Sequence, residues 1–265
     1  MLSAHDITSL VERLNTAART GTAMRAPTAL HPGLTLADAY AVQESWTERH
    51  CAAGRRRIGY KLGLTTPAAQ KGLGIDRPIY GVLFEDMRIA DGGTLALKGL
   101  IAPRAEPELA FVMKTALAGE CSAQEALAAI DYAAPAMEII DNRVLARDPD
   151  TGHDRRALDI IADGGGTCAF VVGTARFDPR ALDLAKIETR FTAGSTGGTG
   201  LFSNVFGSPE NALIHLAREL AARGGSLQPG DTVLTGSPLK PAALASGDTV
   251  TADFGSLGAI SLSIA

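Results

Sequence analysis

The pattern of apolar and polar positions predicts helices in the first part of the chain. A first helix is predicted before Gly21 by apolar residues that recur at helical spacing, namely Ile7, Leu10, Val11 and Leu14. A second is predicted to begin after Thr35 and to end near Gly54, on the apolar positions Leu36, Tyr40, Val42 and Trp46. We therefore expect an N-terminal helical portion over residues 1–57.

From residue 58 onward, short β-prone segments alternate with glycine, proline and aspartate, which predicts a mixed or antiparallel sheet. Two helices interrupt it: one follows Ser122, whose spacing to Glu125 fits a capping box, and one runs from Ser208 to Gly224. Residues 248–264 predict a hairpin with a glycine-containing turn. Strands and helices do not alternate regularly, so we predict an α+β fold with a mixed-β catalytic domain at 58–265, continuous with the helical portion.

The composition excludes several classes of protein. The 265 residues are 46% hydrophobic and 20% charged, with a formal net charge of −4 and no basic run, so no nucleic-acid partner is expected. No apolar run approaches the roughly 18 residues that a membrane span needs, and the N-terminus lacks the pattern of a signal peptide. Three widely spaced cysteines (Cys51, Cys121 and Cys168) argue against disulfides and zinc, and indicate a reducing, cytoplasmic location.

Two glutamates stand out in the apolar segment 101–113. Glu106 and Glu108 are two positions apart, so in a strand their side chains lie on the same face, where burial is costly unless a positive group lies near. Glu138 lies in a second strand-like segment. Three converging carboxylates would suit a divalent cation, Mg²⁺ or Mn²⁺. The alternative is that the glutamates are solvated or pair with Arg104 and Arg143.

Other features of the sequence carry weaker indications. Pro107, between the two glutamates, predicts an edge strand or a strand end. The five histidines form no metal-binding pair, and no nucleophile elbow or phosphate loop is present. The glycine-rich segments 163–167 and 194–200 could cradle an anion, but turns are the commoner outcome for such runs.

Lys61 follows a short apolar run and lies among glycines, which suits a partly buried lysine that transfers a proton. Asp76 could orient this lysine. The simpler alternatives are a surface lysine at a strand end and a turn aspartate before Pro78.

Five motifs in order resemble one enzyme group. The chain from about residue 35 onward resembles the 2-oxo-alkenoate hydratase and 4-oxalocrotonate decarboxylase group of the fumarylacetoacetate hydrolase superfamily, which serves aromatic meta-cleavage pathways. The segments that carry the resemblance are "GYKLGLTT", "GIDRPIYGVLFEDM", "IAPRAEPELAFV", "PAMEIIDNR" and "LTGSP". The resemblance implies a mixed β-roll with an N-terminal helical portion, and a homo-oligomer.

The resemblance also implies roles for individual residues. The metal ligands fall on Glu106, Glu108 and Glu138, and the catalytic residues on Lys61 and Asp76. Lys61 would shuttle protons, and Asp76 would hold it or activate water. Further residues are expected to contact the substrate: Arg143, Asp163, Thr235, Gly236 and Ser237. Gly164 departs from the asparagine that relatives usually carry, which puts any contact from that amide in question.

The expected activity is addition of water to a 2-oxo acid substrate that chelates the cation. A decarboxylase or acylpyruvate hydrolase on the same scaffold is the alternative, and a non-catalytic partner subunit is a third, opposed by the retention of all three glutamates. Residues 141–164 and the C-terminal tail resemble hydratases of 2-oxo-heptenedioates. A nearby arginine could bind the distal carboxylate, or these arginines could be ordinary surface charges: Arg143, Arg147, Arg155 and Arg156.

Overall fold

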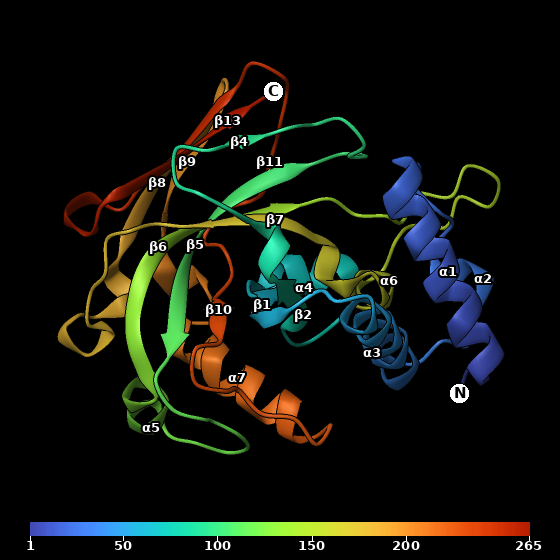
Figure 1. Cartoon of the computed structure of the whole chain (residues 1–265), viewed down its shortest axis with the longest axis horizontal. Helices are drawn as coiled ribbons and strands as arrows, with labels where there is room; N and C mark the ends of the chain where they lie inside the picture. Colours follow the sequence, from blue (N-terminus) through green and yellow to red (C-terminus); the bar gives the residue numbers. More distant parts are fainter.

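Two curled β-sheets form the centre of the computed structural model, which describes residues 1–265 (Figure 1). The eight-stranded sheet contains, in order, β2 (Ile79–Phe84), β1 (Arg57–Gly63), β10 (Thr232–Leu234), β5 (Arg104–Met113), β6 (Ile130–Ile140), β7 (Thr167–Val172) and β3 (Arg88–Ile89), with β11 (Ala242–Ala243) also paired to β5. The five-stranded sheet contains β4 (Thr94–Leu95), β13 (Ala259–Ile264), β12 (Thr249–Asp253), β8 (Glu188–Ala193) and β9 (Thr196–Leu201). The predicted α+β class is confirmed.

The two predicted N-terminal helices are present. They are α1 (Ala4–Thr20) and α3 (Leu36–Ala52), with the short α2 (Pro27–Leu30) between them. Ser3 and Thr35 each form a capping box, and Gly21 ends α1 in the left-handed conformation. These helices lie together at one side of the molecule, beside α6 (Ala157–Ala162; Figure 1). None of the helices is long and apolar enough to cross a bilayer.

The later helices are also confirmed. Ser122 caps α5 (Ala123–Ala128) with the expected capping box, and α7 (Pro209–Ala221) follows Ser208. Two further helices are not predicted by periodicity: α4 (Pro67–Leu73) and α6 (Ala157–Ala162). They have seven and six residues, too few for an apolar repeat to be distinguished from a buried loop.

The C-terminal hairpin is confirmed, since β12 and β13 pair antiparallel. The prediction that residues 194–200 form a turn is only partly right. Gly194 has a φ of 55° and makes the turn, but β9 begins at Thr196 and forms an edge of the smaller sheet. A Cβ at Gly200 would lie 2.9 Å from Leu239 Cγ, so the glycine here permits close packing rather than a bend.

The prediction that Pro107 marks an edge strand or strand end is wrong, because β5 is an interior strand. On one side of β5, β10 pairs with residues 110–112 and β11 with residues 104–105. Thr235 N donates to Leu109 O on that side. The main-chain N–H and C=O groups of successive residues in a strand point to alternate sides. The main-chain N of Pro107 therefore points to the same side of β5 as the main-chain groups of Leu109. Its missing N–H therefore falls in the gap between the two partner strands and breaks no ladder.

One buried apolar cluster joins the helical and β portions, from Leu10 in α1 to Ile264 in β13. The first strand begins at Arg57, close to the expected division at residues 57 and 58. That division stays a prediction.

His50, on α3, gives a test of this packing. Its ring centroid lies 4.1 Å from that of Trp46, the single tryptophan of the chain. Burial and the nearby charges of Arg55 and Arg143 lower the pKa of His50 to about 4. Because protonated imidazole quenches an adjacent indole, we expect tryptophan fluorescence to titrate with a midpoint near pH 4, rather than near the ordinary value of 6.5.

The direction of this pKa shift determines how the stability of the protein depends on pH. A depressed folded-state pKa means that the unfolded chain binds more protons between pH 6.5 and about 4, so stability falls as the pH falls through that window. His50→Gln should abolish the fluorescence transition and lessen this part of the acid destabilisation. A fluorescence midpoint near 6.5 would show that His50 is not packed as described.

Candidate metal centre and active site

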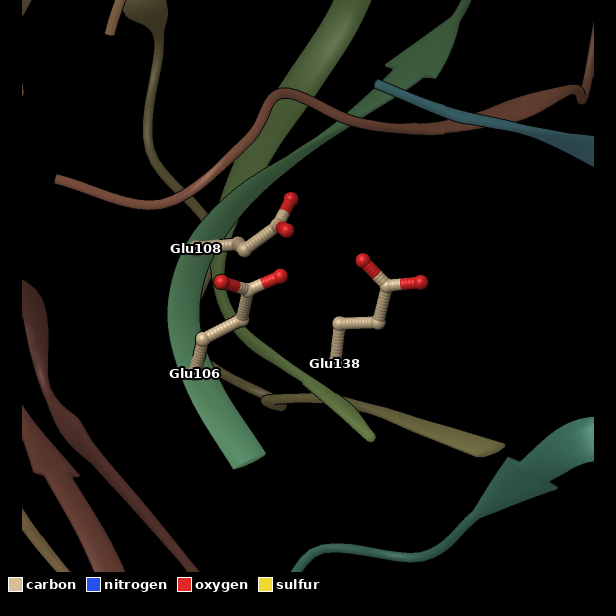
Figure 2. Close-up of side chains that lie close together, drawn as sticks. All are labelled: Glu106, Glu108 and Glu138. Atoms are coloured by element: carbon tan, nitrogen blue, oxygen red, sulfur yellow. The ribbon is translucent and has the colours of Figure 1, made fainter. Parts of the chain in front are cut away.

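The three glutamates converge as the sequence predicts. Glu106 and Glu108 lie on β5, and Glu138 on β6 is the register partner of Glu106. One oxygen from each carboxylate lies within 4.8 Å of the others. Figure 2 shows the three side chains directed toward a common space.

All three carboxylates are removed from water. Glu108 and Glu138 are 0% exposed and Glu106 is 9% exposed. Arg143 forms its ion pair with Asp163, and Arg104 forms no ion pair with the glutamates. Both alternatives, that the glutamates are solvated and that they pair with these arginines, are therefore wrong.

The positive group beside the glutamates is Lys61. Its Nζ lies 2.9 Å from Glu138 Oε2, and the residue is 2% exposed. Lys61 is on β1, which β10 and β5 separate from β6 within the sheet. Only the curl of that sheet lets the two side chains meet. The expectation of a buried lysine is confirmed, and the surface alternative is wrong.

The electrostatics of the cluster favour a bound cation. The three carboxylates and the one ammonium carry a net charge of −2 when all are ionised. Burial and the charge of Glu138 raise the pKa of Glu106 to about 8, and burial likewise raises the pKa of Glu108 well above its ordinary value. Burial by itself would lower the pKa of Lys61, but the glutamate charges outweigh it and leave that pKa raised. A divalent cation would cancel the net charge.

The donor set also fits such a cation. Glu108 Oε1 is buried without a hydrogen-bond partner. A buried carboxylate oxygen without a partner is costly, and coordination would remove that cost. Oxygen-only ligands are those that hard divalent cations such as Mg²⁺ prefer.

The segment 234–238, "LTGSP", lies beside Glu108. Gly236 N donates to Glu108 Oε2 at 2.7 Å. Gly236 has a φ of 98°, and a Cβ there would lie 2.5 Å from Thr65 Oγ1, so only glycine fits. Thr235 is buried with an unpartnered Oγ1, and Ser237 Oγ accepts from Leu239 N. The structure thus brings Gly236 to Glu108, and contact of Thr235, Gly236 and Ser237 with substrate stays a prediction.

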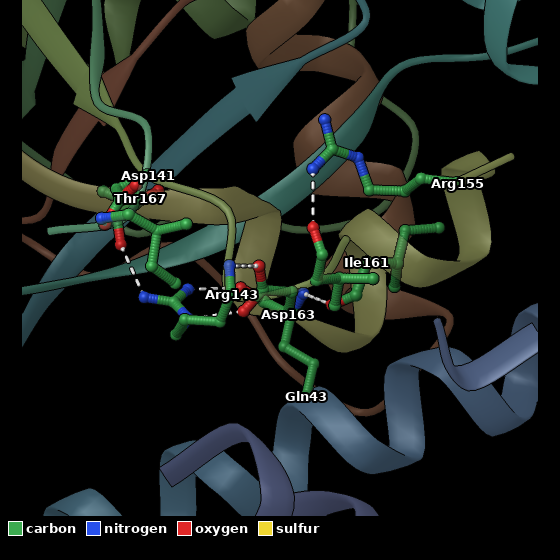
Figure 3. Close-up of polar contacts among 9 residues, drawn as sticks. Gln43, Asp141, Arg143, Arg155, Ile161, Asp163 and Thr167 are labelled. Carbon is green, nitrogen blue, oxygen red and sulfur yellow. Dashed lines mark hydrogen bonds and ion pairs between the residues drawn. The ribbon is translucent and has the colours of Figure 1, made fainter. Parts of the chain in front are cut away.

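Arg143 and Asp163 are bonded to each other (Figure 3). The Nε of Arg143 donates to Asp163 Oδ1, and its main-chain N donates to Oδ2 at 2.7 Å. Its other guanidinium nitrogens donate to Asp163 O at 2.6 Å and to Thr167 O at 3.3 Å. This pair braces the chain between residues 163 and 167, and its predicted contact with substrate is not tested.

The glycines of segment 163–167 make a tight turn rather than an extended loop. Gly164, Gly165 and Gly166 have φ values of 66°, 76° and 72°. A Cβ at Gly165 would lie 3.2 Å from Lys61 Cδ, so the turn packs on the stem of the lysine. A Cβ at Gly81 would lie 2.2 Å from Gly164 O, which makes Gly81 necessary for the same approach. The left-handed φ of Gly164 is one that asparagine also adopts.

Asp76 does not meet Lys61 in this structure. Its side chain is 80% exposed and pairs with Arg77 at 2.8 Å. The interpretation that Asp76 holds the lysine is wrong here, because Glu138 occupies that position. A separate role in activating water stays a prediction.

The sequence analysis does not identify two hydroxyl groups of the site. Thr167 Oγ1 donates to Glu138 Oε1 at 2.9 Å, and Thr65 lies against Gly236. Both residues lie inside motifs that the sequence singles out, "DGGGT" and "YKLGLTT". The type of residue gives no signal, however, because threonine is common at turns and strand ends.

A curled mixed sheet that carries three buried carboxylates and a buried lysine defines a class of enzyme whose carboxylates could hold a metal ion. The family model described as fumarylacetoacetate (FAA) hydrolase C-terminal matches residues 67–265. The chain belongs to this family, as its motifs predict.

Individual relatives narrow the class. The chain is 36% identical over 263 residues to a 2-oxo-hept-4-ene-1,7-dioate hydratase of Escherichia coli, and the alignment covers 98% of each chain. It is 36% identical over 238 residues to a 2-hydroxyhexa-2,4-dienoate hydratase of Comamonas testosteroni, covering 88% of each. A solved 4-oxalocrotonate decarboxylase of Pseudomonas putida G7, complexed with magnesium and adipate, superposes with a TM-score of 0.93 at 29% identity, covering 100% of this chain and 99% of that one.

Proposed function

We propose that this protein is a hydratase, a lyase that adds water to a 2-hydroxy-alkadienoate or 2-oxo-alkenoate. The product is a 4-hydroxy-2-oxo acid, formed in the catabolism of aromatic compounds through meta-cleavage. The observation that carries the proposal is the near full-length identity to hydratases, combined with a complete set of glutamates and the buried Lys61.

Glu106, Glu108 and Glu138 would hold the cation, and Mg²⁺ and Mn²⁺ are both suited to these oxygen ligands. The bound cation would supply a Lewis acid for the carboxylate and keto oxygens of a 2-oxo acid. Lys61 Nζ, held by Glu138, would deliver a proton to substrate carbon and recover the proton that the 2-hydroxyl group of the dienoate loses on ketonisation. The buried setting already keeps bulk water from these charges, which strengthens their electrostatic interactions.

The decarboxylase is the second candidate, favoured by the TM-score of 0.93 to a solved member of that group. The same scaffold and the same charge stabilisation would serve loss of carbon dioxide, so the fold does not separate the two reactions. The higher identities, 36% against 29%, belong to hydratases and favour hydration. Hydrolysis of an acylpyruvate would also use this scaffold.

A panel of 2-hydroxy-dienoates and oxo-diacids, incubated with Mg²⁺ or Mn²⁺, tests the proposal. We expect the hydrated product, identified by mass, in the presence of metal and none after chelation. Carbon dioxide released from an oxo-diacid without hydrated product would instead make the protein a decarboxylase. Light scattering on the same sample tests the homo-oligomer that we also propose.

We further propose a preference for a substrate with a distal carboxylate. Of the four arginines near residues 148–152, Arg143 is bonded to Asp163 and Arg147 to Asp154. Arg156 is exposed, whereas Arg155 is half-buried; its Nη1 donates to Val144 O at 2.9 Å and its Nε has no partner, so we take Arg155 as the candidate that binds the carboxylate. Arg155→Met should lower kcat/KM for a seven-carbon diacid but not for the five-carbon monoacid. Equal wild-type kcat/KM for both substrates would remove this preference and leave the hydratase assignment in place.

A further inference from the structure

We propose that Thr167 is a positioning residue, whose hydroxyl sets the orientation of the Glu138 carboxylate for both the lysine and the cation. The inference rests on the proposed function in one respect, namely that the glutamates bind a divalent cation.

The two oxygens of Glu138 are held separately. Thr167 Oγ1 donates to Oε1 at 2.9 Å, and Lys61 Nζ lies 2.9 Å from Oε2. Both Thr167 and Glu138 are buried, at 1% and 0% exposure, so water does not compete for these bonds. Rotation of the carboxylate about its last torsion would break both contacts. The hydroxyl therefore helps to fix the plane of the carboxylate relative to the lysine.

Thr167 is itself held in place by the fold. It is the first residue of β7, and the pairing of β6 with β7 shifts register between Ile139 and Ile140. Such a bulge re-aims the side chains beside it, and here Thr167 reaches Glu138 although its own register partner is Ile140. Arg143 Nη1 also donates to Thr167 O, which ties the residue to the Arg143–Asp163 pair.

No other side-chain hydroxyl performs this task for the glutamates. Glu108 is held by the main-chain N–H of Gly236, and Glu106 accepts no hydrogen bond. Glu138 is thus the one ligand that the lysine and the cation share. Its other oxygen, Oε1, accepts from the Thr167 hydroxyl, which a substitution can remove without changing the backbone. A charged acceptor makes this a strong hydrogen bond.

The test compares Thr167→Val, which keeps the shape and loses the hydroxyl, with Thr167→Ser, which keeps the hydroxyl. Mn²⁺ binding to the metal-free protein is measured by electron paramagnetic resonance, and kcat and KM are measured at saturating metal. We expect Thr167→Val to weaken Mn²⁺ binding and to lower kcat by about tenfold each, with KM little changed. Thr167→Ser should stay within about twofold of the wild type in both.

Thr189→Val is the matched control, because Thr189 is 0% exposed and its Oγ1 has no hydrogen-bond partner. It should leave Mn²⁺ binding and kcat unchanged. Normal Mn²⁺ binding and kcat in Thr167→Val would overturn the proposal, as would equal losses in the valine and serine variants, which would indicate packing alone. If the wild type binds Mn²⁺ but turns over no substrate of the panel, the proposed function fails while the binding comparison still decides the role of Thr167. If the wild type binds no Mn²⁺, both fail.

Discussion

Replacement of Glu108 by alanine is expected to remove nearly all metal-dependent turnover while the protein stays folded. Glu108 contributes one of only three carboxylates, and its Oε1 has no other partner. Since Lewis-acid stabilisation contributes several kcal/mol and each 1.36 kcal/mol is a factor of ten, we expect a loss of about three orders of magnitude in kcat/KM. Turnover is measured after chelation and restoration of Mg²⁺, together with Mn²⁺ binding.

The metal-free protein should tolerate this change. Removing one of three buried carboxylates relieves like-charge repulsion, which offsets the space left by the side chain. Glu108→Gln separates the two effects, since it keeps the volume and loses the charge. Glu48→Gln, at an exposed position outside the site, is the control and should behave as the wild type. Full activity of Glu108→Ala after chelation and Mg²⁺ restoration would refute the ligand assignment.

We expect replacement of Lys61 by methionine to lower turnover by about 10²-fold or more, because methionine has similar length but carries no proton. Substrate binding should change less than turnover, so that kcat falls more than KM rises. Lys61 is buried against Glu138, and its loss also leaves three carboxylates without a nearby ammonium. Mn²⁺ binding is therefore measured in parallel, to distinguish lost proton transfer from altered metal affinity.

Lys71→Met is the control for this variant, because Lys71 is exposed on α4. It should retain wild-type kcat and KM. Near-normal turnover in Lys61→Met would mean that the lysine only balances the charge of the glutamates, and another group would then have to move the proton.

Local chemistry made much of this fold predictable. The helices that begin at Ala4, Leu36 and Ala123 follow serine or threonine caps whose bonds span only three residues. The alternation of side chains along a strand likewise places Glu106 and Glu108 on one face without reference to the rest of the chain. Glu138 was proposed as their partner from a second strand-like segment, and motif order then led to the family.

Features that depend on neighbouring strands were harder to read. An interior strand accommodates Pro107 because two short partner strands leave a gap beside it. The residues of segment 101–113 do not predict where those partner strands end. Asp76 follows Lys61 closely in the sequence yet lies exposed beside Arg77. Closeness along the chain did not predict contact.

The sequence by itself determined the N-terminal helices, the hairpin, the family and the paired glutamates, because each depends on spacing within a short segment. Only the tertiary structure decided that Lys61 is the counter-ion of Glu138, that Arg143 is bonded to Asp163, and that Thr167 holds the second oxygen of Glu138. These contacts join residues 20 to 77 positions apart. They exist because the large sheet curls and one bulge shifts the register of β7. Neither the curl nor the register can be predicted from the local pattern of residues.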